Sequence, residues 1–133
     1  MNVLEAITAM QGYFDTQWSD TPILWGGDDP TKIPNETFVR FNILHNEGTQ
    51  VTMGDPNNNR HRRFGTITIQ IFQPEGAYGV EARTHAKNIL SIYTGLVQSD
   101  IIYRNPILRE VGNDGHGWYQ INVVMNFQYD EIT

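Results

Sequence analysis

Two segments of regular two-residue alternation constrain the fold more than any other feature of this sequence. Between Trp118 and Tyr129 the odd-numbered positions are apolar or aromatic, whereas most even-numbered positions are Gln or Asn. The segment 62–72 alternates in the same way, with isoleucines set against threonines and a glutamine. Successive side chains of a β-strand point to opposite faces, so each segment predicts a strand with one buried and one polar face.

Helical spacing of apolar residues predicts two helices. The first covers residues 2–18, is capped by Asn2 with Glu5 in its first turn, and ends before Pro22. Its apolar stripe is predicted to contain Val3, Ile7, Met10 and Phe14, with Leu4 and Trp18 beside it. The second covers residues 78–97, with a stripe of Ala82, Ala86, Ile89, Tyr93 and Leu96.

The other elements are strands, of which two form a long hairpin around the Asn-rich turn 54–59. Strands are predicted over residues 23–25, 37–46, 62–72, 101–103, 107–111 and 118–129, and residues 49–53 extend the hairpin. We therefore expect one domain over residues 1–133 with an α+β fold, in which two helices pack on one face of a mostly antiparallel sheet.

Composition excludes several classes of protein. The 133 residues are 39% hydrophobic and include no cysteine, so the chain is not disordered and has no disulfide or thiolate metal site. We expect no membrane span, because no apolar run approaches the roughly 20 residues that a span requires. We expect no secretion signal either, because the N-terminal segment MNVLEAITAM lacks a basic region and a long apolar core. Nine Lys and Arg against 15 Asp and Glu give a net charge of −6, which disfavours binding to a phosphate backbone.

The segment from Gly76 to Gly79 has the strand–loop–helix order of phosphate-binding sites, but it lacks their chemistry. A P-loop requires a Lys and a Ser or Thr after its last glycine, and here Val80 and Glu81 follow. The acidic Glu75 and Glu81 flank the loop, where they suit a helix dipole better than a phosphate. We predict a hinge in which at least one glycine has a positive φ, and no bound cofactor.

Other familiar chemical motifs are missing from the sequence. The four histidines, His45, His61, His85 and His116, show no paired spacing, and the loop aspartates fit turns better than an ion site. No serine has the context of a catalytic nucleophile. We expect no metal and no catalytic residue, although two carboxylates acting as acid and base stay possible, with no pair singled out.

Two features suggest contact with another molecule. One is a cluster of basic residues at the base of the hairpin turn, Arg60, His61, Arg62 and Arg63. This cluster is either solvated or in contact with an acidic neighbour, and contact with DNA is the least favoured interpretation. Uncharged polar residues also line one predicted sheet face, which is either an ordinary exposed face, a face covered by another subunit or the wall of a water-filled channel. They are Thr66, Thr68, Gln70, Gln120, Asn122, Asn126 and Gln128. The candidate interface residues are Trp25, Arg60, Arg62, Arg63, Tyr78, Gln120, Asn122 and Asn126.

The order and character of the segments are those of a known family. A short Pro-x-Leu-Trp strand leads through a Pro-containing loop to "TFVRFNIL", and then come "RRFGTITIQIF", "PEGAYG", "EARTHAKNILSIYTGL" and "GWYQINVVMNFQYDE". The sequence resembles the tail terminator proteins of long-tailed bacteriophages, the group of the phage lambda minor tail protein U. The resemblance covers nearly the whole chain and includes no catalytic motif.

This resemblance implies a structural protein and not an enzyme. A homo-hexameric ring would cap the tail tube, end its polymerisation and join it to the head connector or stopper protein. Genomic DNA would pass through the ring without sequence-specific binding, and the protein would be assembled in the host cytoplasm and reside in the virion. The alternatives are a neck protein of the head-completion or stopper type and, less favoured, a small host hydrolase or ligand-binding domain.

Overall fold

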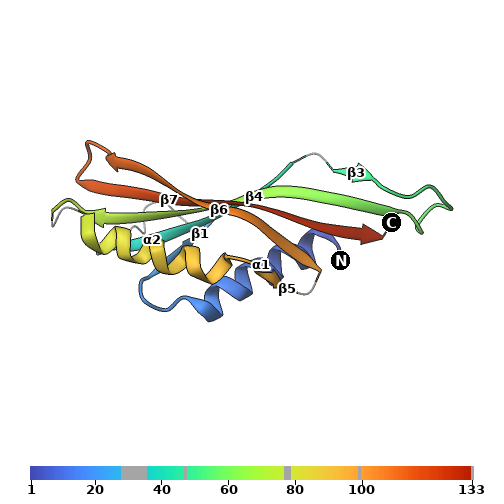
Figure 1. Ribbon diagram of the computed structural model, residues 1–133, viewed down its shortest axis with the longest axis horizontal. Helices are drawn as coiled ribbons and strands as arrows, with labels where there is room; N and C mark the ends of the chain where they lie inside the picture. Colours follow the sequence, from blue (N-terminus) through green and yellow to red (C-terminus); the bar gives the residue numbers. More distant parts are fainter. Residues whose placement is uncertain (28–35, 47, 77–78, 99, 133) are drawn as a thin grey trace.

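The computed structural model describes residues 1–27, 36–46, 48–76, 79–98 and 100–132. Two helices and seven strands occur in these residues (Figure 1). In chain order they are α1 (Val3–Gln17), β1 (Ile23–Trp25), β2 (Phe38–His45), β3 (Thr49–Gln50), β4 (Arg60–Pro74), α2 (Val80–Tyr93), β5 (Val97–Gln98), β6 (Ile101–Asn113) and β7 (Trp118–Ile132). The predicted α+β class is confirmed.

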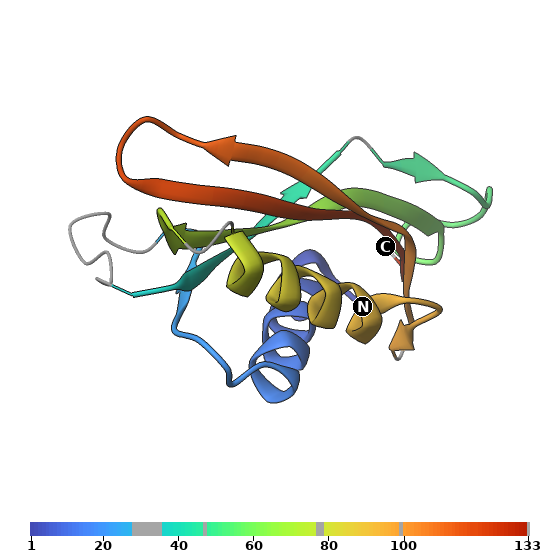
Figure 2. The ribbon, with the colours of Figure 1, turned by 60° about the vertical axis from the view of Figure 1, so that its left-hand side comes forward.

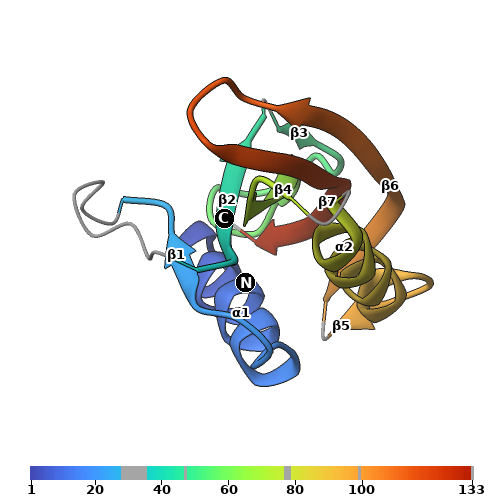
Figure 3. The ribbon, with the colours of Figure 1, turned by 90° about the vertical axis from the view of Figure 1, so that its left-hand side faces the viewer.

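The described strands form one seven-stranded sheet in the order β1-β2-β4-β7-β6-β5, with β3 also paired to β4. All pairs are antiparallel except β1 with β2, so the predicted mostly antiparallel sheet is confirmed. Figures 2 and 3 show from two further sides that the sheet is strongly twisted and curled. No helix in the described ranges is long and apolar enough to cross a membrane.

The centre of the sheet is the antiparallel pair β4 and β7. Their register runs without a break from Arg60 opposite Ile132 to Pro74 opposite Trp118. Both strands are longer than the sequence predicts, and they extend past the helices toward the C-terminus (Figure 1). The alternation of both strands is confirmed, because Ile67, Ile69 and Ile71 are fully buried while Thr66, Thr68 and Gln70 are not.

Side chains of both helices and of the odd-numbered strand positions form one hydrophobic core. Its members are Ala6, Met10, Phe14, Trp18, Val39, Phe41, Ile67, Ile69, Ile71, Ala82, Ala86, Ile89, Tyr93, Ile101, Tyr103, Ile121, Val123, Met125, Phe127 and Tyr129. Phe14 links the layers, with ring centroids 5.1 Å from Phe41 and 6.5 Å from Tyr93. Each large side chain buried in this way stabilises the fold by about 1.5–3 kcal/mol.

The start of α1 follows the predicted cap. The backbone N–H of Glu5 donates to Asn2 Oδ1 at 2.8 Å, and Asn2 Nδ2 donates to Glu5 Oε1 at 2.9 Å. The buried stripe of α1 is Ala6, Met10 and Phe14, so the predicted stripe is wrong at its start. Leu4 is 73% exposed, because its position lies on the solvent side of the helix.

The sequence prediction is wrong in three segments. The second helix ends at Tyr93 instead of residue 97, because Gly95 takes a left-handed φ of 69° and the chain continues into β5. The strands predicted over residues 101–103 and 107–111 form a single strand, β6, whose register shifts between Arg104 and Ile107. There Asn105 has a φ of 52° and Pro106 has no N–H for the ladder, so the strand bulges and then resumes. The extension predicted over residues 49–53 is limited to Thr49 and Gln50.

Three glycines are required by their surroundings or their backbone conformation. A Cβ on Gly65 would overlap the Phe127 ring and the Leu44 carbonyl oxygen, so only glycine allows these strands their observed approach. Gly79 is the N-cap of α2 with a φ of 69°, and a Cβ there would lie 2.5 Å from Tyr119 Cε1. Gly76 has a φ of 132°, so the prediction of a glycine hinge with a positive φ is confirmed.

The replacement Gly79→Ala tests this hinge against a matched control. Gly95 has the same φ of 69°, but nothing lies within 4 Å of the position that a Cβ would take there. Both variants bear the cost of a left-handed alanine, whereas Gly79→Ala must also displace the Tyr119 ring. We expect Gly79→Ala to lose about 1–3 kcal/mol more than Gly95→Ala in urea unfolding. Equal losses would contradict the proposed contact.

Candidate functional site

Seven uncharged polar side chains lie together on one side of the central strands. We call this surface the polar sheet face; it consists of Thr66, Thr68, Gln70, Gln120, Asn122, Asn126 and Gln128, all at even-numbered positions. The register places Thr66 opposite Asn126 and Gln70 opposite Asn122. The sequence prediction that these residues share a face is therefore confirmed. The register brings together three of the candidate interface residues, Gln120, Asn122 and Asn126.

Hydrogen bonds link the side chains of the polar sheet face to one another. Asn42 Nδ2 donates to Gln70 Oε1 at 3.2 Å, which extends the face onto β2. Gln120 Nε2 donates to Asn122 Oδ1 at 2.8 Å along β7. Each amide has more donors and acceptors than these bonds use, so the face retains hydrogen-bonding capacity toward a partner or water.

The arginine cluster pairs with acidic residues of its own chain. Arg62 Nε donates to Asp130 Oδ1 at 3.1 Å, and Arg60 Nε lies 3.7 Å from the same carboxylate. Arg63 Nη2 donates to Glu131 Oε1 at 3.1 Å. Side-chain exposures of 53%, 37% and 33% for the three arginines mark these as surface pairs, each worth about 0–1 kcal/mol.

The other two candidate interface residues are less informative. The Trp25 ring packs edge-on against Phe14 and Phe41 at 6.3 Å and 5.4 Å, so much of its apolar surface already contacts the core. Tyr78 lies outside the described residues, and so does most of the loop predicted over residues 26–36.

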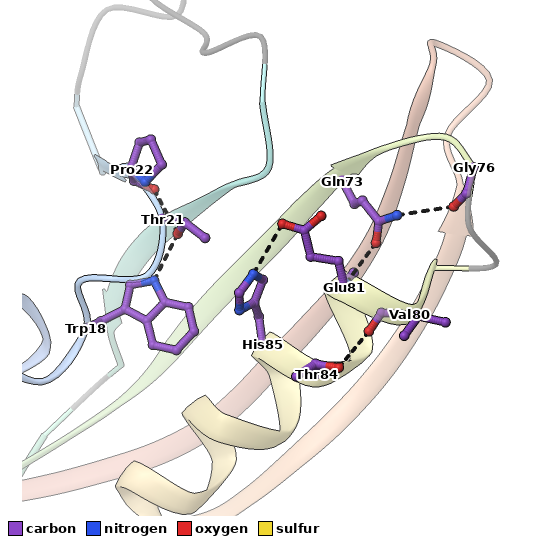
Figure 4. A network of polar contacts seen from close by, with 10 residues as sticks. Trp18, Thr21, Pro22, Gln73, Gly76, Val80, Glu81, Thr84 and His85 are labelled. Atoms are coloured by element: carbon purple, nitrogen blue, oxygen red, sulfur yellow. Dashed lines mark hydrogen bonds and ion pairs between the residues drawn. The ribbon is translucent and has the colours of Figure 1, made fainter.

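A cleft of about 420 Å³ opens where β4 meets α2, and we call it the β4–α2 cleft. Its lining residues are Asp20, Thr21, Pro22, Glu36, Thr37, Gln73, Pro74, Glu75, Gly76 and Glu81. Four of these are acidic and exposed, and none is Lys or Arg. Figure 4 shows the polar contacts around it, including Trp18 Nε1 donating to Thr21 Oγ1 at 2.9 Å and the 3.4 Å ion pair of Glu81 with His85.

Gln73, which lies on strand β4, caps the N-terminus of α2. The backbone N–H of Ala82 donates to Gln73 Oε1 at 2.8 Å, while Gln73 Nε2 donates to the Gly76 carbonyl at 3.1 Å (Figure 4). Gly79 has no side chain that could cap the helix, so a buried glutamine supplies the acceptor instead. The acceptor position that a phosphate would occupy at this helix is thus held by the chain itself.

The histidines do not converge. Across the described ranges, no three His, Cys, Asp or Glu side chains come close enough together to hold a metal ion. His45 Nε2 lies 2.8 Å from the Tyr129 hydroxyl, and burial, followed by the Arg63 charge, lowers the pKa of His45 below 6.5. Asp114 Oδ1 accepts from the backbone N–H groups of His116 and Trp118, which lowers the pKa of that carboxyl and accounts for it as a turn residue.

Comparisons with known proteins support the fold alone. No protein-family model matches the chain, and no curated protein matches its sequence. Twenty chains of solved structures match it. One of them, whose name states no function, covers 92% of this chain and 94% of its own length with a TM-score of 0.64 and 14% identity.

Gln73 is a helix-capping position that the sequence analysis missed. It occupies the buried phase of β4 directly after three isoleucines, where an apolar residue would continue the pattern. A polar residue in that phase, followed by a helix whose cap position is glycine, is the signal that could have identified it.

Replacing Gln73 with alanine is expected to destabilise the fold by about 1–2 kcal/mol, because it removes the cap and leaves two backbone groups without their partner. Gln17→Ala, at the exposed end of α1, is the control and should change stability by no more than about 0.5 kcal/mol. Urea unfolding followed by circular dichroism measures both. Similar values for the two variants would refute the capping role.

The lowered pKa of His45 predicts a pH dependence of stability. Since the unfolded chain binds a proton more readily at this histidine, stability is retained above pH 6.5 and declines as the pH falls below it. We expect His45→Gln to remove this part of the acid destabilisation, whereas His116→Gln keeps it. Unfolding free energies at about pH 5 and 7.5 provide the measurement. A wild-type pH dependence that survives in His45→Gln would exclude this assignment.

Proposed function

We propose that the protein is a structural subunit of a phage tail. In this proposal a ring of subunits caps the finished tail tube, stops its polymerisation and joins it to the head connector. The observation that carries the proposal is the order and character of the segments, which resembles the tail terminator family over nearly the whole chain. The polar sheet face supports it, because amides and threonines suit a surface that another subunit covers.

The same proposal assigns the two faces of the sheet. We infer that both helices cover one face, since α1 and α2 contribute Phe14 and Tyr93 to the same core as the odd-numbered positions of β4 and β7. The even-numbered positions then face away from the helices. This arrangement leaves the polar sheet face available to a neighbouring molecule.

The partners follow from this role. The ring is a homo-hexamer that binds the tail tube protein on one side and the head–tail connector or stopper protein on the other. Genomic DNA passes through it without sequence-specific binding, a role that suits a chain with a net charge of −6. The proposed subunit acts in the virion without enzymatic chemistry and is assembled in the host cytoplasm.

Ring formation on tube ends is the direct test. We expect a monomer at low concentration that forms six-fold rings when concentrated or when tail tubes are added, as seen by native mass spectrometry and electron microscopy. Thr68→Tyr, at the centre of the polar sheet face, should reduce ring formation at least about tenfold, because extra bulk disturbs a close-fitting contact. Thr16→Tyr, exposed on α1, is the matched control.

Three results would count against this assignment. Closed dimers or trimers as the final species would exclude the six-fold ring. Rings that bind isolated head connectors but leave tube ends bare would favour the neck or stopper alternative. A monomer that does not bind tail tubes but binds a small molecule in the β4–α2 cleft would favour the host ligand-binding alternative.

A further inference from the structure

Arginines gather on the polar sheet face, although the chain as a whole is acidic. Five arginines occupy strand positions on the same side of the sheet as the seven residues that define this face. Asp130 is the one acidic residue among the described strand positions on that side. The five arginines are Arg40, Arg60, Arg62, Arg104 and Arg109. Five positive charges and one negative charge give the face +4, which leaves −10 for the rest of a chain whose total is −6.

Much of this positive charge is not compensated within the subunit. Arg60 and Arg62 share the single carboxylate of Asp130. Arg104 and Arg109 lie on the exposed part of β6, opposite Asn126 and Asn122, and form no ion pair with the described residues. An excess of exposed guanidinium groups among amides is suited to binding an anionic partner in a defined orientation.

The complementary surface is present on the same chain. Asp20, Glu36, Glu75 and Glu81 line the β4–α2 cleft and are all exposed. Only Glu81 has an ion-pair partner among the described residues, and that partner is His85. The acidic groups lie at the end of β4 beside α2, whereas the arginines lie along the strands, so one subunit carries two separate surfaces of opposite charge.

We propose that the arginine-bearing polar sheet face of one copy docks on the acidic β4–α2 cleft of the next copy; this inference rests on the ring proposed above. The contact joins two different surfaces and is therefore heterologous, which is the kind of contact that builds a closed ring. A second copy fits better than nucleic acid, because the complementary charge is supplied by the chain itself. Opposite charge also orients the copies and disfavours face-to-face pairing.

Charge reversal with exchange tests this pairing. Arg104→Glu with Arg109→Glu lowers the charge of the polar sheet face from +4 to zero, and Glu36→Arg with Glu75→Arg brings the four negative charges of the cleft to zero. We expect each double variant alone to self-associate at least about tenfold more weakly than wild type in sedimentation velocity. An equimolar mixture of the two should recover association, since the unchanged face of the cleft variant then meets the unchanged cleft of the face variant. Asp15→Arg with Asp55→Arg, both exposed elsewhere, is the control and should stay within about twofold of wild type.

The outcomes separate this inference from the proposed function. If both double variants form rings as readily as wild type, the pairing of these surfaces is overturned and the proposed ring is not. A wild type that stays monomeric with tube ends present would overturn both. Binding of a DNA duplex that is lost in the Arg104→Glu and Arg109→Glu variant, with self-association unchanged, would assign the face to nucleic acid. If the charge-reversing substitutions impair folding, the neutral variant Arg104→Gln with Arg109→Gln is used in their place. We expect it to fold, as checked by circular dichroism, and to show weakened self-association.

Discussion

The pairing of β4 with β7 is the constraint on which the rest of the structure depends. The unbroken register between these strands decides which side chains enter the core and which form the polar sheet face. A slip by one residue would expose Ile67, Ile69 and Ile71 and bury threonines and amides, so one face being buried specifies the register strongly. Gly65 contributes to this specification, because only a glycine fits beside the Phe127 ring.

The sequence predicts elements better than it predicts their neighbours. Alternation identified β4 and β7 and the phase of each, because burial of one face imposes a period of two. It could not show that β7 lies between β4 and β6 or that β1 pairs parallel to β2, since those choices depend on long-range packing. The wrong boundaries at Tyr93 and at Asn105 occur where backbone conformation changes at single residues, and such positions leave little trace in periodicity.

The candidate surfaces were predictable in part for the same reason. Membership of the polar sheet face followed from strand phase alone. The ion pairs of the arginine cluster did not, because Asp130 and Glu131 lie 68 residues away from Arg62 and Arg63 and meet them only through the register. The position of Arg104 and Arg109 on this face could not be predicted from strand phase either, because the bulge at Asn105 changes the phase of β6 between them.

The composition of the polar sheet face suits reversible assembly more than permanent association. Threonine and asparagine have few rotatable bonds, so ordering them in a contact costs less side-chain entropy than ordering Lys or Glu. Water can satisfy their remaining hydrogen-bonding groups in the free subunit, so a single contact between copies in the proposed ring would be weak. In the proposed ring the arginines and the acidic cleft would give such a contact its direction, and the net charge of −6 would keep copies apart when they are not aligned. In the proposed ring every subunit uses both surfaces at once, so closure stabilises a set of contacts that would each dissociate alone.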